Sequence, residues 1–227
     1  MHILYNSIRR EHVGDIVPQV AQKEQSENCI LLHQYRGEPL PETPKFPKLV
    51  LEKKAKPADW LVSNYVPTVT DALVSERLFK IISSYSTMKM QAFPVPLATD
   101  HGVLPYYILH FLQFATSYVN FDKTLFQAVS FPEMTKSTFQ FDSYESFERQ
   151  RLEKGIKGKV SALFIQSVPY DFFSLEVPSV FVVKNQSFIE ELVRKRITGI
   201  ELVPLQEGED FTEKKRSKIA RKGLKFN

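Results

Sequence analysis

Two short pairs of side chains have the types and spacing that metal binding or proton transfer requires. Glu52 and Lys54 are spaced as Glu-x-Lys at the end of the apolar run LVLEKK, and alternate residues of a strand point to the same side. In some metal-dependent nucleases this spacing directs a carboxylate and a lysine at the scissile phosphate. Asp100 and His101 form an adjacent acid–imidazole pair in TDHG. One interpretation of the chain is therefore a metal-dependent nuclease or hydrolase that uses these residues.

Both pairs also have simpler structural interpretations. Glu213 and Lys215 repeat the Glu-x-Lys spacing, and neither copy follows a clear strand that carries a partner aspartate. His101 is typical of a turn, and His110, inside an apolar run, is typical of a hydrogen-bonded core histidine. The 5 histidines never fall four residues apart, so no helical face presents two imidazoles to zinc. The chain also has no GxSxG, Walker, GxGxxG, HExxH or CxxC motif, so we expect no cofactor and no metal.

The basic charge is concentrated in one segment of the chain. The net charge is +4, of which residues 212–227 carry +6, and this leaves −2 on residues 1–211. A basic tail binds phosphates by releasing counterions, so a nucleic-acid-binding adaptor that acts through the tail is a further alternative. The tail lacks the interleaved aromatic residues of single-strand binders, so we expect it to be disordered and do not expect nucleic acid as the partner.

The composition predicts a folded protein in a reducing compartment. Of 227 residues, 43% are hydrophobic and 25% are charged, which is the balance of a globular protein. The single cysteine, Cys29, cannot form an internal disulfide, and the N-terminal sequence shows no signal peptide. The apolar stretches are too short to span a membrane. We expect a cytoplasmic protein with no membrane association, folded as a single α+β domain over residues 1–211.

Two segments with the same layout predict the elements that position these residues. Residues 72–97 and 181–205 each contain a β-rich run, a helix-capping residue, apolar residues at a helical period and a strand ending in Val-Pro-Leu. Ser75 and Asn185 are the predicted N-caps, and Gly199 is the predicted left-handed cap after the second helix. The pattern predicts two similar strand–helix–strand units, with chance similarity of two amphipathic helices as the alternative. The predicted buried faces are Leu78, Phe79 and Ile82 in the first helix and Phe188, Leu192 and Val193 in the second.

The remaining segments predict a mixture of helices and strands. Residues 105–126 are predicted to form a buried helix, because apolar residues cover most of a turn. Residues 137–154 are predicted to form a strand and then a helix capped by Asp142 or Ser143, and residues 159–168 and 170–177 to form paired strands. Residues 36–57, with five prolines, are predicted to be irregular apart from a short strand at 49–51. Because helices and strands do not alternate regularly, we expect an α+β fold with a mixed or antiparallel sheet and packed helices.

Four residues are candidate contacts with a partner protein. Trp60 is the single tryptophan of the chain, a residue type common at energetic hot spots, with core packing as the alternative. Asp142, Glu145 and Glu148 recur at intervals of three and form an acidic helical face. A solvated face with local ion pairs, for example to Arg149, is the alternative there.

An ordered series of motifs carries a resemblance to a known group of proteins. The motifs are KPADWL at 56–61, LVSERL at 73–78, FPV at 93–95, YYIL at 106–109, FFSL at 172–175 and ITGIELVP at 197–204. In this order they resemble the bacterial immunity-protein families of polymorphic toxin systems that are classed as types 11 and 43. The resemblance covers about residues 50–206, and its most specific part is LVSERL followed far downstream by TGIELVP.

The resemblance implies an antidote that is not an enzyme. Such a protein is cytoplasmic, is encoded beside a toxin, binds the C-terminal domain of that toxin stoichiometrically and blocks its active site. It needs shape complementarity and a few desolvated anchor residues, and no cofactor. An inhibitor that imitated nucleic acid would be strongly negative, so the net charge of −2 on residues 1–211 predicts occlusion by a fitted surface instead.

Overall fold

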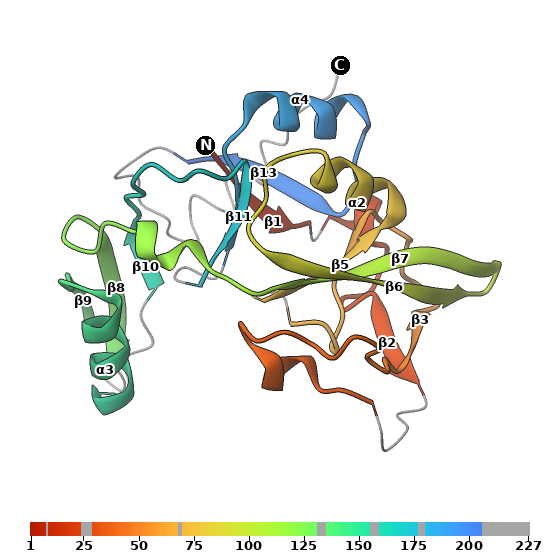
Figure 1. Cartoon of the computed structure of the whole chain (residues 1–227), viewed down its shortest axis with the longest axis horizontal. Coiled ribbons are helices and arrows are strands. Elements are labelled where there is room, and N and C mark those ends of the chain that lie inside the picture. The colour runs from red at the N-terminus through yellow and green to blue at the C-terminus, as the bar shows by residue number, and fades with distance from the viewer. Residues whose placement is uncertain are drawn as a thin grey trace. The chain divides into compact units, whose positions relative to one another are not determined.

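The computed structural model of the chain is an α+β protein that consists mostly of sheet, which confirms the fold class predicted from the sequence (Figure 1). The described residues are 1–7, 9–23, 29–67, 70–130, 135–154, 159–176 and 180–205. The chain divides into two compact units: the first comprises Met1–Phe114 and Tyr170–Leu202, and the second Ala115–Pro169 and Val203–Asn227. The predicted basic tail, residues 212–227, lies outside the described residues.

The first unit is built around a six-stranded sheet. In order across the sheet, its strands are β2 (Val20–Lys23), β3 (Lys48–Leu51), β6 (Met90–Thr99), β7 (Gly102–Phe111), β5 (Asp71–Ser75) and β4 (Trp60–Leu61). β3 and β6 run parallel, and the other neighbouring pairs are antiparallel. The strand predicted at 49–51 is confirmed as β3. The helix α1 (Arg10–Val13) and the 3-10 helix η1 (Leu32–Tyr35) lie in the connections.

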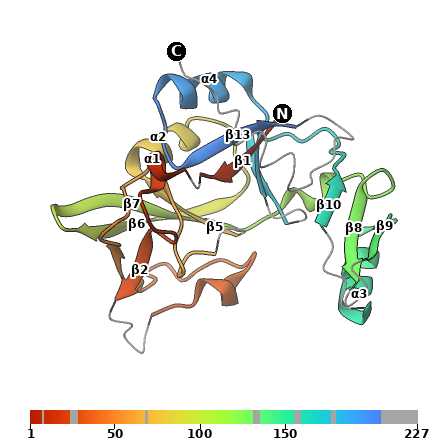
Figure 2. The same cartoon turned by 180° about the vertical axis from the view of Figure 1, so that it is seen from behind.

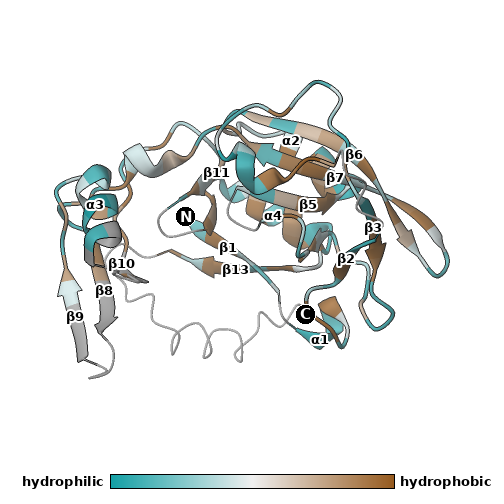
Figure 3. Ribbon diagram, turned by 90° about the horizontal axis from the view of Figure 1, so that it is seen from below, coloured by the Kyte–Doolittle hydropathy of each residue, from teal (hydrophilic) through white to brown (hydrophobic). Residues whose placement is uncertain are grey.

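The central strand β7 is buried on both faces of this sheet. Leu109 and Phe111 belong to the apolar cluster on one side, and Ile108 belongs to the cluster on the other side. A strand covered on both faces carries apolar residues at consecutive positions, as Ile108 and Leu109 do here, and parts of β5 and β7 are brown in Figure 3. The buried helix predicted over 105–126 is wrong for this reason, because a run of apolar residues does not distinguish a helix from a buried strand. Residues of that range form the end of β7, the 3-10 helix η2 (Ala115–Tyr118) and the start of β8 (Leu125–Ser130).

β6 and β7 form a long hairpin, which Figure 2 shows from behind. The last pair of the ladder is Thr99 with Gly102, so Asp100 and His101 make the connecting turn. Gly102 has a φ of +129°, a conformation that favours glycine. The predicted place of His101 in a turn is confirmed.

A four-stranded sheet, which apart from Val203 and Pro204 belongs to the same unit, combines an N-terminal strand with C-terminal ones. Its order is β11 (Phe172–Leu175), β12 (Val180–Val183), β1 (His2–Asn6) and β13 (Ile200–Pro204). The residues before position 52, which the resemblance hardly covers, therefore supply strands to both sheets of the first unit. The predicted pairing of 159–168 with 170–177 is wrong: β11 pairs with β12, and β10 (Lys159–Ala162) pairs with β8.

Two strand–helix–strand units are present, as the sequence predicts. α2 (Glu76–Ser83) connects β5 to β6, and α4 (Gln186–Arg194) connects β12 to β13. In each strand–helix–strand segment a third strand lies between the two strands that the helix connects. This third strand is β7 in the segment that contains α2 and β1 in the segment that contains α4. The side chains of Ser75 and Asn185 accept hydrogen bonds from backbone N–H groups of the first helical turn, which confirms both predicted N-caps.

α2 and α4 lie side by side in Figures 1 and 2. Tyr85, just after α2, stacks on Phe188 of α4 with ring centroids 4.5 Å apart, and its hydroxyl donates a hydrogen bond of 2.9 Å to Glu191. Val193 is exposed, so its predicted burial is wrong, because a residue five positions after Phe188 is rotated by about 140° around the helix. The other predicted face residues are buried or partly buried in the core: Leu78, Phe79, Ile82, Phe188 and Leu192.

The left-handed residue that ends α4 is Arg196, with a φ of 51°. The backbone N–H groups of Arg196 and Ile197 donate to carbonyls in the last turn of α4, in the Schellman pattern. The predicted role of Gly199 as this cap is therefore wrong. Its φ of +80° serves a close backbone approach, because a Cβ at this position would lie 2.1 Å from the carbonyl oxygen of Trp60.

The second unit contains a three-stranded antiparallel sheet among its described residues. β8 lies between β10 and β9 (Thr135–Phe139), and α3 (Tyr144–Lys154) follows β9. Phe126 and Phe147 pack with ring centroids 4.9 Å apart and bring α3 against β8. The predicted strand and helix over 137–154 are confirmed, and Ser143 is the cap, since its hydroxyl accepts a hydrogen bond from the Ser146 N–H. Across both units, no helix among the described residues is long and apolar enough to span a membrane.

Candidate functional site

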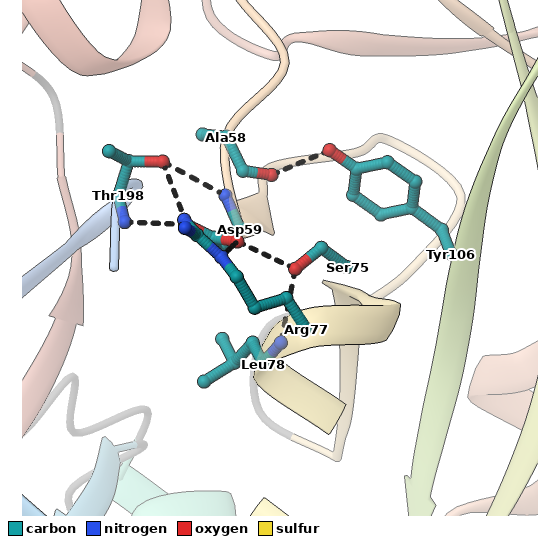
Figure 4. Close-up of polar contacts among 7 residues, drawn as sticks. All are labelled: Ala58, Asp59, Ser75, Arg77, Leu78, Tyr106 and Thr198. Atoms are coloured by element: carbon teal, nitrogen blue, oxygen red, sulfur yellow. Dashed lines mark hydrogen bonds and ion pairs between the residues drawn. The ribbon is translucent and has the colours of Figure 1, made fainter. Parts of the chain in front are cut away.

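Asp59 is a buried carboxylate at the meeting point of three segments of the first unit. It precedes β4, and it contacts the start of α2 and the segment between α4 and β13. Its oxygens accept hydrogen bonds from the Ser75 hydroxyl at 2.7 Å, from Arg77 Nε at 3.0 Å and from the Thr198 N–H at 2.9 Å. Figure 4 shows Asp59 between Thr198 on one side and Ser75 on the other.

The Asp59 carboxylate is charged and saturated with hydrogen bonds. Burial by itself raises the pKa of Asp59, but the hydrogen bonds from Arg77, Thr198 and Ser75 outweigh burial and hold this pKa below its ordinary value. A second Arg77 nitrogen and the Thr198 hydroxyl also donate, which brings the hydrogen bonds to five. A carboxylate offers about four lone-pair sites. Asp59 therefore has no acceptor position left for a metal ion or for a substrate proton.

Several motifs of the immunity-protein resemblance meet at this network. The residues involved are Asp59 in KPADWL, Ser75 and Arg77 in LVSERL, Tyr106 in YYIL and Thr198 in ITGIELVP. Tyr106 donates from its hydroxyl to the carbonyl of Ala58 at 2.7 Å (Figure 4). Asp59 and Thr198 are 139 positions apart in the sequence. These motifs therefore hold the approach to β4, the start of α2 and the approach to β13 together as a scaffold.

Asp71 and His110 form a second buried charged pair, between β5 and β7. They are cross-strand partners with 0% exposure, and His110 Nδ1 lies 2.6 Å from an Asp71 carboxylate oxygen. His110 Nε2 lies 2.8 Å from the carbonyl oxygen of Glu38. The Asp71 carboxylate and the Glu38 carbonyl both accept hydrogen bonds. The His110 ring can donate to both only when both of its nitrogens carry a proton, which is the imidazolium form. The predicted hydrogen-bonded core role of His110 is confirmed, whereas its partner Asp71 was not predicted, because the sequence does not show which residues face each other across strands.

The environment of His110 favours its charged form. Burial lowers the pKa of His110, but the hydrogen bonds to Asp71 and to the Glu38 carbonyl outweigh burial and raise this pKa above its ordinary value. The Thr70 hydroxyl donates to the second oxygen of Asp71. The pair is closed off from solvent and hydrogen-bonded on all sides, so it stabilises the sheet and presents no group to a substrate.

Ser7, His12 and Glu201 bring together the side-chain types of a hydrolase triad, which no sequence motif indicates. The Ser7 hydroxyl oxygen lies 3.1 Å from His12 Nδ1, and it donates to Glu201 at 3.1 Å. In a triad the histidine lies between the nucleophile and the carboxylate, but here the serine lies between the other two. Ser7 is also 0% exposed. The cluster therefore fastens the end of β1 to α1 and β13 and does not present a nucleophile.

The residues of the hydrolase interpretation do not form a joint site. β3 ends at Leu51, and Lys54 lies in the turn that follows, so the expectation that Glu52 and Lys54 share one side of a strand is wrong. Asp100 and His101 are exposed in the β6–β7 turn. Within the part of the chain that the structure describes, no three His, Cys, Asp or Glu side chains are grouped so that they could hold a metal ion.

The four candidate partner contacts lie in different environments. Trp60 is 1% exposed, and its ring packs 5.0 Å from the ring of Phe181 in the core of the first unit. Its side chain therefore offers no surface to a partner. Asp142 and Glu145 are exposed and Glu148 is half-buried. Asp142 precedes α3, and Glu145 and Glu148 lie within this helix, which is drawn mostly in teal in Figure 3. The exposed side chains of Asp142 and Glu145 are accessible to a partner.

Of the residues in the Asp59 network, only Ser75 has a role predicted from the sequence, that of an N-cap, and the network as a site was not predicted. The signal was present, because the motifs of the resemblance contain all of its side chains. No family model matches the chain, and the search of curated proteins finds no match either.

Proposed function

We propose that this protein is an antidote of the immunity type. In this proposal it is a non-enzymatic cytoplasmic protein that binds the C-terminal domain of a cognate bacterial toxin stoichiometrically and covers the active site of that domain. The observation that supports the proposal is the convergence of KPADWL, LVSERL, YYIL and ITGIELVP on the Asp59 network. These are motifs by which the sequence resembles immunity proteins of polymorphic toxin systems.

The motifs of the resemblance support the structure and do not present a reactive group. We therefore propose that the protein acts through the shape of its surface. The carboxylates of Asp59 and Asp71 are engaged with charged partners inside the protein, so neither is available as a general base. Binding needs a rigid, complementary surface, because rigidity reduces the entropy lost on association. The net charge of −2 on residues 1–211 supports occlusion by such a surface over imitation of a nucleic acid.

A growth assay tests the proposal directly. The toxin domain encoded beside this gene is expressed from an inducible promoter, with and without this protein. We expect growth arrest with the toxin domain alone and normal growth when both proteins are present. Arrest that persists although the antidote is well expressed and folded contradicts the proposal.

A titration separates binding from enzymatic inactivation. Calorimetry with a catalytically inactivated toxin domain is expected to show saturation at a fixed molar ratio. In a second experiment the complex is formed with the catalytically active toxin domain, and toxin recovered from it by denaturation and refolding should have its full activity. Protection by substoichiometric antidote, or a chemically altered toxin, contradicts the proposal.

Two variants test the hydrolase alternative in the same assay. Glu52→Ala and His101→Ala remove the residues on which that alternative depends, and His101 is exposed. We expect both variants to protect as fully as the unaltered protein. Loss of protection in a folded variant supports the hydrolase instead.

A further inference from the structure

Arg196 has a backbone conformation that its own side chain disfavours. Among the described residues, Arg196 is the only non-glycine residue with a positive φ, which is 51°. It occupies the position after the C-cap of a Schellman motif, where glycine is the usual residue. A Cβ in this conformation crowds the following carbonyl oxygen, so arginine is a costly choice here.

The side chain of Arg196 has no partner within the described part of the chain that would offset this cost. The side chains of Arg196 and Lys195 are exposed, and neither side chain makes a hydrogen bond or an ion pair within that part of the chain. Arg194 is paired only loosely, with Glu191 at 3.5 Å, and is 68% exposed. Cations at a helix C-terminus interact favourably with the helix dipole. Arg194 and Lys195 already provide that interaction without the strained conformation.

Val193 adds an exposed apolar side chain next to these cations. It is 38% exposed on a helix whose other large apolar residues, Phe188, Ile189 and Leu192, are buried. Arginine and apolar side chains are common among the residues that contribute most to protein interfaces. Residues 193–196, called here the α4 terminus, thus combine one apolar residue with three cations.

The three residues that follow the α4 terminus in the sequence are each fixed by contacts within the first unit. Ile197 is buried, Thr198 is bonded to Asp59, and Gly199 lies against the backbone of Trp60. A surface that is already ordered loses little entropy when a partner binds. The Asp59 network therefore supports these exposed residues directly.

We infer that the α4 terminus is the contact surface for a carboxylate-rich patch on the toxin domain. The inference rests on the proposed function and adds which surface is used and which charge the toxin carries there. Glu190 and Glu191 lie on the same helix, one exposed and one half-buried. Alternating charge of this kind fits discrete carboxylates on a protein better than the uniform negative charge of a nucleic acid.

Arg196→Gly separates a binding role from a structural one, because the two roles predict opposite effects. Glycine relieves the positive φ, so we expect the thermal midpoint to be unchanged or higher. We expect affinity for the catalytically inactivated toxin domain to fall about tenfold, the scale for truncation of an interface residue that contributes more than about 1 kcal/mol. The association rate of the variant should also depend less on salt than that of the unaltered protein.

Control experiments distinguish a failure of this inference from a failure of the proposed function. Lys45→Ala removes an exposed cation elsewhere in the first unit and should leave affinity unchanged. If Arg196→Gly and the double variant Lys195→Ala with Arg196→Ala both bind the toxin domain with unaltered affinity, the inference is wrong and the proposed function stands. If the unaltered protein does not bind the toxin domain, the proposed function fails, and the inference fails with it. Binding of a short DNA duplex that these variants abolish would also overturn the inference, by assigning the surface to nucleic acid.

Discussion

Gly199 packs against the backbone of Trp60 so closely that a Cβ on residue 199 would lie 2.1 Å from the Trp60 carbonyl oxygen. The contact joins β4 to the segment before β13, where the Trp60 N–H donates to the Thr198 carbonyl at 3.2 Å. Asp59 and Thr198 lie on the two sides of this junction. The geometry of the Asp59 network therefore depends on the absence of a side chain at position 199.

Gly199→Ala is expected to destabilise the protein by about 3 kcal/mol or more, because the new Cβ forces two backbone segments apart. Gly102→Ala is the matched control: its φ is also positive, +129°, but a Cβ added there would meet no atom within 4 Å. Backbone strain alone should cost this control about 1 kcal/mol. Urea unfolding of both variants measures the difference, and equal losses would contradict the close-approach explanation.

Asp59→Asn is expected to lower stability by about 3 kcal/mol at pH 7, because it removes the charged acceptor of five hydrogen bonds from a buried position. The pKa of Asp59 is held below its ordinary value of 3.8 in the folded protein. Its contribution is therefore present above pH 3.8 and is lost as the pH falls through the folded pKa. Urea unfolding should show a difference between variant and unaltered protein that shrinks in acid.

Two comparisons accompany the Asp59 experiment. Asp100→Asn, in the exposed turn, should leave stability unchanged at either pH. Arg77→Ala should cost only about 1 kcal/mol, because the Arg77 side chain is 53% exposed and solvent screens its charge. A larger loss for Arg77→Ala than for Asp59→Asn would contradict the assignment of Asp59 as the centre of the network.

His110→Gln is expected to lower stability by about 3 kcal/mol at pH 6, because Asp71 loses its buried cation. The folded pKa of His110 is raised above the ordinary value of 6.5. The stabilisation is thus complete below pH 6.5 and is lost as the pH rises through the folded pKa. Thermal unfolding at pH 6 and pH 9 should show the larger difference at pH 6, with exposed His101→Gln as the control. A difference that grows with pH would falsify this explanation.

Trp60→Ala and Glu145→Ala distinguish core from surface among the candidate contacts. Removal of the buried Trp60 ring should cost about 3–5 kcal/mol. Glu145 is exposed, so its removal should change stability by no more than about 0.5 kcal/mol. Thermal midpoints measure both effects. A loss of toxin affinity in folded Glu145→Ala then reports a lost contact, whereas a loss in Trp60→Ala reports a damaged core.

Features encoded within a few residues were predicted correctly from the sequence. The caps at Ser75, Ser143 and Asn185 are examples, because a cap hydrogen bond spans only two or three positions. The end of α4 was predicted less well. Glycine is the common left-handed residue after a helix, so Gly199 was the expected choice, but the chain uses Arg196 and reserves Gly199 for its contact with Trp60.

Features that depend on distant segments were not predictable in this way. The Asp59–Thr198 hydrogen bond spans 139 positions, and the Asp71–His110 pair spans 39. Both depend on which residues face each other across strands and loops, and this register is set by the assembled sheet. β7 was assigned to a helix because burial on both faces removes the alternation that identifies a strand.

The position of β1 between β12 and β13 sets when this protein can finish folding. The ribosome makes β1 long before β12, yet His2 of β1 pairs with Val183 of β12. Pairing across such a sequence separation is slow. A nascent chain that stops before β12 has neither strand that flanks β1, so interrupted translation products lack this sheet and the helix α4 that connects its strands. Only chains that extend past α4 therefore contain the surface that we infer to contact the toxin domain.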